Sequence, residues 1–189
     1  MQMVRLEIVV AALAMPLLTM GAAGQGIEGS HHVISAAHNS PGLVDQVREA
    51  TEVFRDVNQT PSGGYFPFLG CVSGPQEGAM GVHFVNMGLV NDLGKIEAGR
   101  PEALIYEPHN GQFRLVGVEY IVTVKDWKDN NPPEIGNFAP VLDGQTFQFV
   151  DSPNRFGLDP FYELHVWAWQ HNPHGAFVDW NTLVSCEGE

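Results

Sequence analysis

The clearest signal for the fold is the stretch Ala103-Leu-Ile-Tyr-Glu-Pro-His-Asn-Gly-Gln-Phe-Arg-Leu-Val-Gly-Val-Glu-Tyr-Ile-Val-Thr-Val124. Two runs rich in β-branched and aromatic residues flank a turn that contains Asn-Gly, a strong short-range sign of a β-hairpin. The spacing predicts a strand over 103–107, a turn over 108–111 and a second strand over 113–124. The fold is therefore expected to be built around antiparallel strands.

One residue of the second strand stands out, because Glu119 is a carboxylate in the middle of an apolar run. Side chains of a strand alternate between its two faces, so Glu119 is predicted to share a face with four others. These are Leu115, Gly117, Ile121 and Thr123. An unpaired buried charge is costly, and burial raises the pKa of a carboxyl group. Glu119 is therefore a candidate catalytic acid or base, or a metal ligand.

A second strand-like segment, Phe161-Tyr-Glu-Leu-His-Val-Trp-Ala-Trp169, lies near the end of the chain. Its even positions are mainly plain apolar residues. Its odd positions mix a carboxylate, an imidazole and aromatic rings: Phe161, Glu163, His165, Trp167 and Trp169. A solvated face rarely carries two tryptophans, and a packed face rarely carries Glu beside His. The odd face is therefore predicted to form the wall of a pocket.

A third candidate strand, which contains His83, supplies a further imidazole. Imidazole and carboxylate together form the ligand set that proteins use for zinc, iron, manganese or copper(II). The leading prediction is one divalent metal ion held by His83, Glu163 and His165. Glu119 would then be a fourth ligand or an acid–base catalyst. Met80 with the two histidines would instead form a softer copper site.

The same residues support two other interpretations. In the first, His165 is a core histidine that is hydrogen-bonded to Glu163 or Glu119 in a packed polar network. In the second, Trp167 and Trp169 line a ligand-binding cavity for an apolar small molecule, rather than filling the core. Enzyme and binding protein are both open at this point. The sequence carries no nucleophile elbow, phosphate loop, dinucleotide fingerprint or helical His-Glu-x-x-His motif.

One convincing helix is predicted over residues 41–57. Ser40 is a good N-cap and Pro41 suits the first helical position. An apolar stripe then recurs at three- and four-residue steps, formed by Leu43, Val47, Ala50, Phe54 and Val57. Further along, a loop is predicted over 126–140 and a strand over 146–150. Helix first and strands afterwards predict an α+β fold, with one N-terminal helix packed on a curved antiparallel β-sheet or small β-barrel.

The chain is expected to have three parts. Residues 1–24 predict a signal peptide, with a positive start at Arg5, an apolar core and small residues at a cleavage site. Residues 25–40 predict a flexible N-terminal arm. Residues 41–189 predict a single globular domain, which has a turn-rich segment from Thr60 onwards. The protein is therefore expected in the periplasm or outside the cell.

The sequence contains two cysteines, Cys71 and Cys186. An even number of cysteines in an exported protein predicts a disulfide. The bond would tie the C-terminal tail to a loop far earlier in the chain. In the chain-entropy model such a long closed loop contributes about 4–5 kcal/mol.

The composition restricts the partners. The formal net charge is −13, from 22 acidic and 9 basic residues. Nucleic acid and anionic membrane surfaces would repel such a chain, so the expected partner is a small-molecule ligand. Hydrophobic residues make up 44% of the sequence, which predicts a folded domain with a real core rather than disorder.

Several blocks resemble a family of exported bacterial proteins of unassigned function. They are Gly78–Asn86, Pro101–Glu107, Leu115–Tyr120 and the segment from Tyr162 to Cys186, within residues 45–187. The resemblance implies export. It implies no activity, cofactor or site.

Overall fold

The hairpin predicted around Asn110-Gly111 is confirmed in the computed structural model, which describes residues 42–131 and 138–188. Strand β3 (Ala103–His109) pairs with β4 (Gln112–Thr123), and Asn110 and Gly111 have φ values of 51° and 75°. Positive φ at both positions is what the tight hairpin turn requires. The predicted signal peptide (1–24) and N-terminal arm (25–40) lie outside the described residues.

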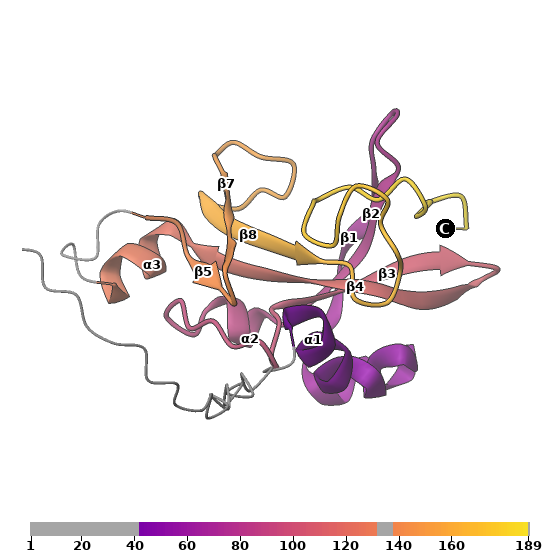
Figure 1. Cartoon of the computed structure of the whole chain (residues 1–189), viewed down its shortest axis with the longest axis horizontal. Coiled ribbons are helices and arrows are strands. Elements are labelled where there is room, and N and C mark those ends of the chain that lie inside the picture. Colours follow the sequence, from indigo (N-terminus) through magenta and orange to yellow (C-terminus); the bar gives the residue numbers. More distant parts are fainter. Residues whose placement is uncertain (1–41, 132–137, 189) are drawn as a thin grey trace, which may run out of the picture. The chain divides into compact units, whose positions relative to one another are not determined.

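Six antiparallel strands form one strongly curled, half-barrel sheet in the order β1-β2-β3-β4-β8-β7 (Figure 1). The further strands are β1 (Phe66–Ser73), β2 (Ala79–Val85), β7 (Gln148–Val150) and β8 (Phe161–Val166). A separate two-stranded pair joins β5 (Val141–Leu142) to β6 (Gln145–Thr146). The predicted α+β class holds. Within the described residues the sheet is open, with β1 and β7 at its edges, and is not a closed barrel.

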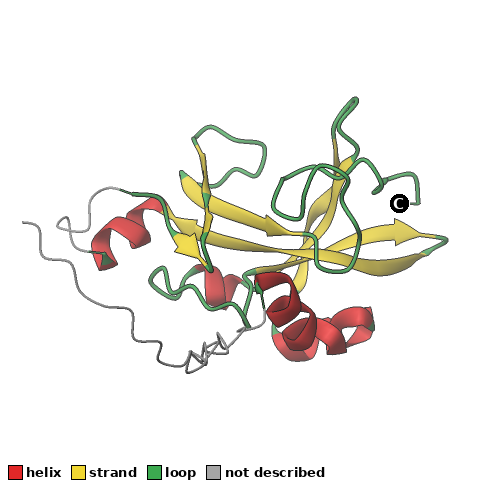
Figure 2. Cartoon of the chain, in the orientation of Figure 1, coloured by secondary structure: helices red, strands yellow, loops and turns green. Residues whose placement is uncertain are grey.

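Short helices lie along one side of the sheet and at one end of it (Figure 2). They are α1 (Leu43–Thr51), the 3-10 helices η1 (Glu52–Arg55) and η2 (Val57–Gly63), α2 (Met87–Val90) and α3 (Val124–Asn130). The predicted helix over 41–57 is α-helical only to Thr51, and its N-cap is Gly42 rather than Ser40. Helix α3 lies where a loop was expected, because the Thr123 side chain caps it by accepting from the Asp126 N–H. No helix within 42–131 or 138–188 has the length and apolar character needed to cross a membrane.

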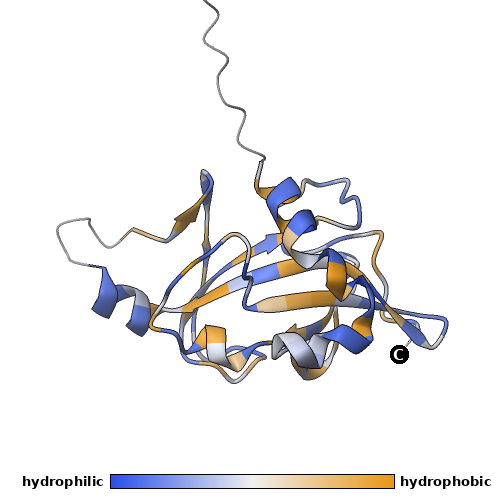
Figure 3. Ribbon diagram, turned by 90° about the horizontal axis from the view of Figure 1, so that it is seen from below, coloured by the Kyte–Doolittle hydropathy of each residue, from blue (hydrophilic) through white to orange (hydrophobic). Residues whose placement is uncertain are grey.

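One face of the sheet, which we call the helix-covered face, packs against α1. Leu43 and Val47 of the helix join a buried cluster with alternate residues of the central strands, among them Leu104, Val118 and Leu164. Figure 3 shows long hydrophobic stretches in the strands, whereas the helices are of mixed character and α3 is largely hydrophilic. This face holds most of the core.

The opposite face, which we call the site face, is covered by the loop before β8 and by the C-terminal segment (Figure 1). Trp167 and Val184 pack there against Ile105, and Phe161 packs against Ile121. The predicted Cys71–Cys186 disulfide is confirmed and links residues 115 positions apart. The bond therefore ties the tail to edge strand β1.

Three strand predictions need correction. The predicted strand over 146–150 is divided between β6 and β7, which belong to different sheets. Strand β1 was expected to be a turn-rich loop, because its glycines and prolines hide a strand whose residues are mostly exposed. In β4, Leu115 was expected beside Glu119, but a bulge opposite Ile105 and Tyr106 leaves Val116 as an extra residue. A bulge shifts the alternation by one residue, so Leu115 packs on the helix-covered face.

Candidate metal centre

Four of the predicted site residues come together on the site face. His83 lies in β2, Glu119 in β4, and Glu163 and His165 in β8. Antiparallel pairing places Glu119 directly opposite His165, and it places Glu163 opposite Ile121, two residues further along β4. Cross-strand neighbours of this kind have side chains in contact range. The register thus gathers all four polar groups in one place.

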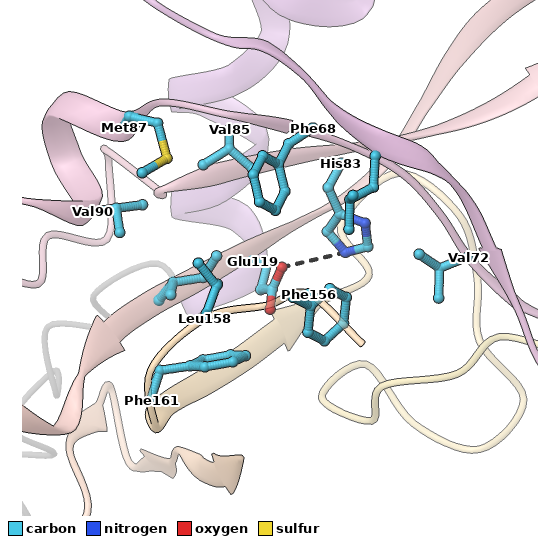
Figure 4. Close-up of a pocket in the computed structure, with 12 residues that line it drawn as sticks. Phe68, Val72, His83, Val85, Met87, Val90, Glu119, Phe156, Leu158 and Phe161 are labelled. Atoms are coloured by element: carbon cyan, nitrogen blue, oxygen red, sulfur yellow. Dashed lines mark ion pairs between the residues drawn. The ribbon is translucent and has the colours of Figure 1, made fainter. Parts of the chain in front are cut away.

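The distances within this group are short. Nε2 of His83 lies 3.3 Å from Oε2 of Glu119, the contact drawn as a dashed line in Figure 4. The rings of His83 and His165 are nearly perpendicular, with centroids 5.9 Å apart. On its other side, Nδ1 of His165 lies 3.6 Å from Oδ1 of Asp179. All of these side chains are buried except that of Asp179, which is 22% exposed.

Two carboxyl groups of the cluster, those of Glu119 and Glu163, affect each other's ionisation. Burial and the neighbouring charge of Glu163 raise the pKa of Glu119 well above its usual value. Burial also raises the pKa of Glu163 to about 7, although the hydrogen bond with Glu119 acts in the opposite direction. Two carboxyl groups in contact cannot both ionise readily, so this contact favours the protonated form of Glu119.

The imidazoles are held in the neutral form. Burial lowers the pKa of His83 to about 4, and burial together with the proximity of His83 lowers the pKa of His165 to about 3. At neutral pH neither ring carries a charge. A neutral ring nitrogen with a free lone pair is the form in which histidine binds metals.

Three buried polar atoms of the cluster have no hydrogen-bond partner among the described residues. They are Nδ1 and Nε2 of His165 and Oε2 of Glu163. Leaving a buried donor or acceptor unsatisfied costs about 1–3 kcal/mol, and most buried polar groups in folded proteins are paired. The cluster is therefore incomplete as it stands.

The geometry offers two overlapping groups that could hold a metal ion. His83, Glu119 and His165 form the first, and Glu163, His165 and Asp179 form the second. In each group the ligand atoms lie within 4.8 Å of one another, and His165 belongs to both. The first group is wholly buried. It is a set of two imidazoles and one carboxylate, which zinc and other divalent transition metals accept.

Asp179 is the functional residue that sequence reasoning missed. It lies in an irregular segment, where no periodicity predicts a direction for its side chain. The segment that carries Asp179 is held in place by Trp167. The backbone N–H of Trp167 donates to the carbonyl of Ala176, and its indole Nε1 donates to the carbonyl of Val178. The only local signal is its position in the His-rich stretch that follows β8.

The two tryptophans expected to bind a ligand lie on different faces. Trp167 is buried on the site face, where its ring stacks against that of His165 at 6.3 Å. Trp169 packs with the helix-covered core, and its Nε1 donates to Oγ1 of Thr51. The prediction that Trp169 shares the face of His165 is wrong because β8 ends at Val166 and the chain turns there.

A small pocket reaches the centre from the side of β1 and α2 (Figure 4). Its walls are apolar and include Phe68, Val85, Phe156 and Phe161. The polar groups that line it are those of His83 and Glu119. The cavity measures about 30 Å³. An apolar channel thus ends at the first metal-capable group.

Comparisons of the chain with protein-family models, with curated proteins and with solved structures found no match. The function therefore has to be inferred from the chemistry of this cluster. The distances, the burial and the unpaired atoms described above supply that chemistry.

Proposed function

We propose that the protein is an exported protein that binds one divalent metal ion through His83, Glu119 and His165. The observation that carries this proposal is the ring of His165, whose two buried nitrogens have no hydrogen-bond partner within the described part of the chain. A metal–nitrogen bond would recover the free energy that such an orphaned atom costs. A fully packed polar network, the competing interpretation, would leave no atom of this kind unpaired.

The chemistry of the donors supports the same conclusion. Both imidazoles are neutral at physiological pH, so protons do not compete with the metal for them. The carboxyl group of Glu119 gives up its proton when it binds the ion. Three protein ligands leave at least one coordination position open, as catalytic zinc sites do. Nitrogen and oxygen donors suit zinc, iron, manganese or copper(II).

The two glutamates exchange the roles expected from the sequence. Glu119 lies in the group with His83, whereas Glu163 lies in the group with Asp179. We assign Glu119 as the ligand. Glu163 becomes the carboxyl group that takes up or releases a proton beside the metal, since its pKa of about 7 suits that task. Asp179 faces Nδ1 of His165 and would orient the ring, as carboxylates beside metal-bound histidines commonly do.

Elemental analysis tests the metal site. The protein is purified without a His tag, and the arm histidines His31, His32 and His38 are replaced by glutamine throughout, so that the arm contributes no ligands. We expect a stoichiometric divalent metal in this background and its loss in His165→Gln and Glu119→Gln. The matched control is His109→Gln, because His109 is an exposed histidine outside the cluster. If His83→Ala and His165→Ala both leave metal content and thermal stability unchanged, the proposal fails.

Export is supported by the disulfide, since such bonds persist in oxidising compartments. Cell fractionation and N-terminal sequencing of the natural protein test it. We expect the protein in the periplasm or the medium, with a mature N-terminus just after the small residues at 21–24. A full-length protein in the cytoplasm would contradict this part of the proposal.

A further inference from the structure

The pocket in Figure 4 has a polar inner end and apolar walls. Its inner end is formed by His83 and Glu119, which belong to the proposed metal site. Its walls come from β1, β2, α2, β8 and the loop before β8. Water is poorly held by such walls because they offer it no hydrogen bonds. The coordination position that faces this pocket is therefore suited to a ligand with an apolar body.

The charges around the centre limit the donor group of that ligand. Three carboxyl groups, those of Glu119, Glu163 and Asp179, lie within the two metal-capable groups. Once ionised, two of these carboxyl groups balance the charge of a divalent ion. No arginine or lysine lines the pocket in the described part of the chain. An anionic donor would thus be repelled, and a cationic one would face the metal itself, so a neutral donor fits best.

The size of the cavity limits the shape of the ligand. A volume of about 30 Å³ is roughly two to three times the space that one water-sized probe occupies, so only a slim group enters. The outer part of the pocket is formed by Leu69 and Met87, which are 51% and 47% exposed. A longer apolar body would leave the cavity between these two side chains.

We propose that the pocket binds a neutral small molecule with one nitrogen or oxygen donor and a slim apolar body. The donor takes the open coordination position beside His83 and Glu119. The apolar body lies between Phe68 and Phe156 and extends towards Met87. This inference rests on the proposed metal site and adds the class of molecule that the site accepts.

The test uses cobalt(II)-loaded protein and a series of straight-chain alkyl nitriles, from methyl to hexyl, as slim neutral nitrogen donors. The visible spectrum of cobalt(II) reports its coordination, so binding of the probe is expected to change it. Each added methylene group that enters the pocket should tighten binding by about threefold to fourfold. Affinity should level off once the chain passes Met87.

A variant of the pocket wall distinguishes probe binding inside the apolar pocket from probe binding to a metal ion that is merely exposed. Met87→Gln should weaken binding of the hexyl probe about threefold to fivefold, by loss of apolar contact, and leave the methyl probe unaffected. Leu183→Gln is the control, because Leu183 is 50% exposed and lies outside the pocket lining. Cobalt binding with no spectral response, or with no dependence on chain length, would overturn the inference and spare the metal site. Failure to bind cobalt at all would overturn both.

Discussion

On the helix-covered face, the buried hydroxyl groups of three tyrosines each donate to a backbone carbonyl, whereas on the site face His165 keeps both ring nitrogens without a partner in the described residues. The tyrosines are Tyr65, Tyr106 and Tyr120, and their acceptors are the carbonyls of Pro101, Phe54 and Ala98. The same strands build both faces. On the helix-covered face, the chain itself supplies the hydrogen-bond partners of these buried hydroxyl groups. On the site face, the two nitrogens of His165 lack such partners within the described residues.

Buried acids show the same difference. Glu102 is 1% exposed, and its Oε2 accepts a hydrogen bond from the backbone N–H of Ile121. Glu163 is similarly buried, but one of its oxygens has no partner among the described residues. A carboxyl group with a fixed backbone donor serves structure. The carboxyl group of Glu163, which lies beside another carboxyl group and two unpaired nitrogens, is instead a candidate for a functional role.

The largest effect is expected where packing is complete. Leu104→Ala removes a fully buried side chain from the helix-covered face, and we expect it to lower the free energy of unfolding by about 4–5 kcal/mol. Because this face does not contact the metal-capable groups, the loss should be the same with zinc and with a chelator. Urea denaturation in both conditions measures it. A loss that depends strongly on zinc would show that the two faces are coupled.

Metal removal should act only through the site face. At zinc concentrations 100- to 1,000-fold above Kd, binding should raise the free energy of unfolding by about 3–4 kcal/mol. Chelation should abolish this gain in the wild type and change nothing in His165→Gln. Thermal melts of both proteins with zinc and with chelator provide the measurement. An equal zinc response in the two proteins would place the metal elsewhere.

The buried carboxyl group of Glu102, on the helix-covered side, should control part of the pH dependence of the free energy of unfolding. Burial raises the pKa of Glu102 to about 8, above its unfolded value of about 4.5. The folded state therefore holds the proton more tightly, and the stability that Glu102 contributes is present below pH 4.5 and is lost as pH rises towards 8. Glu102→Gln should be more stable than the wild type by about 3 kcal/mol at pH 7 and equal to it at pH 4.5. Urea titrations at both pH values check this, and an unchanged difference between them would contradict it.

The smallest expected effects have opposite signs on the two faces. Tyr120→Phe removes a satisfied hydrogen bond and should lower the free energy of unfolding by about 1 kcal/mol. His165→Leu removes two unsatisfied nitrogens, so in the metal-free protein it should raise that free energy by about 1 kcal/mol. Chemical denaturation in chelator compares the two variants. If both destabilise equally, His165 is an ordinary packed core residue.

The sequence by itself determined the local elements and the faces within each strand. Asn110-Gly111 specified the hairpin, and alternation put Glu163 and His165 on one face, because the side-chain period of a strand is two. The even number of cysteines, together with the predicted export signal, predicted the disulfide. These inferences need only neighbouring residues or composition. They failed where a bulge or a strand end shifted the alternation, at Leu115 and Trp169.

Only the tertiary structure decided which strands lie side by side. The order β2-β3-β4-β8 brings His83 within 3.3 Å of Glu119, and the folding of the C-terminal segment brings Asp179 to His165. It also revealed strand β1, in which Phe68, Leu69 and Val72 form one wall of the pocket. Strand pairing between distant segments depends on the burial free energy of the whole chain, which no short window of sequence contains. The sequence thus predicted four residues of the centre as one group, but only the tertiary structure showed their distances and added Asp179.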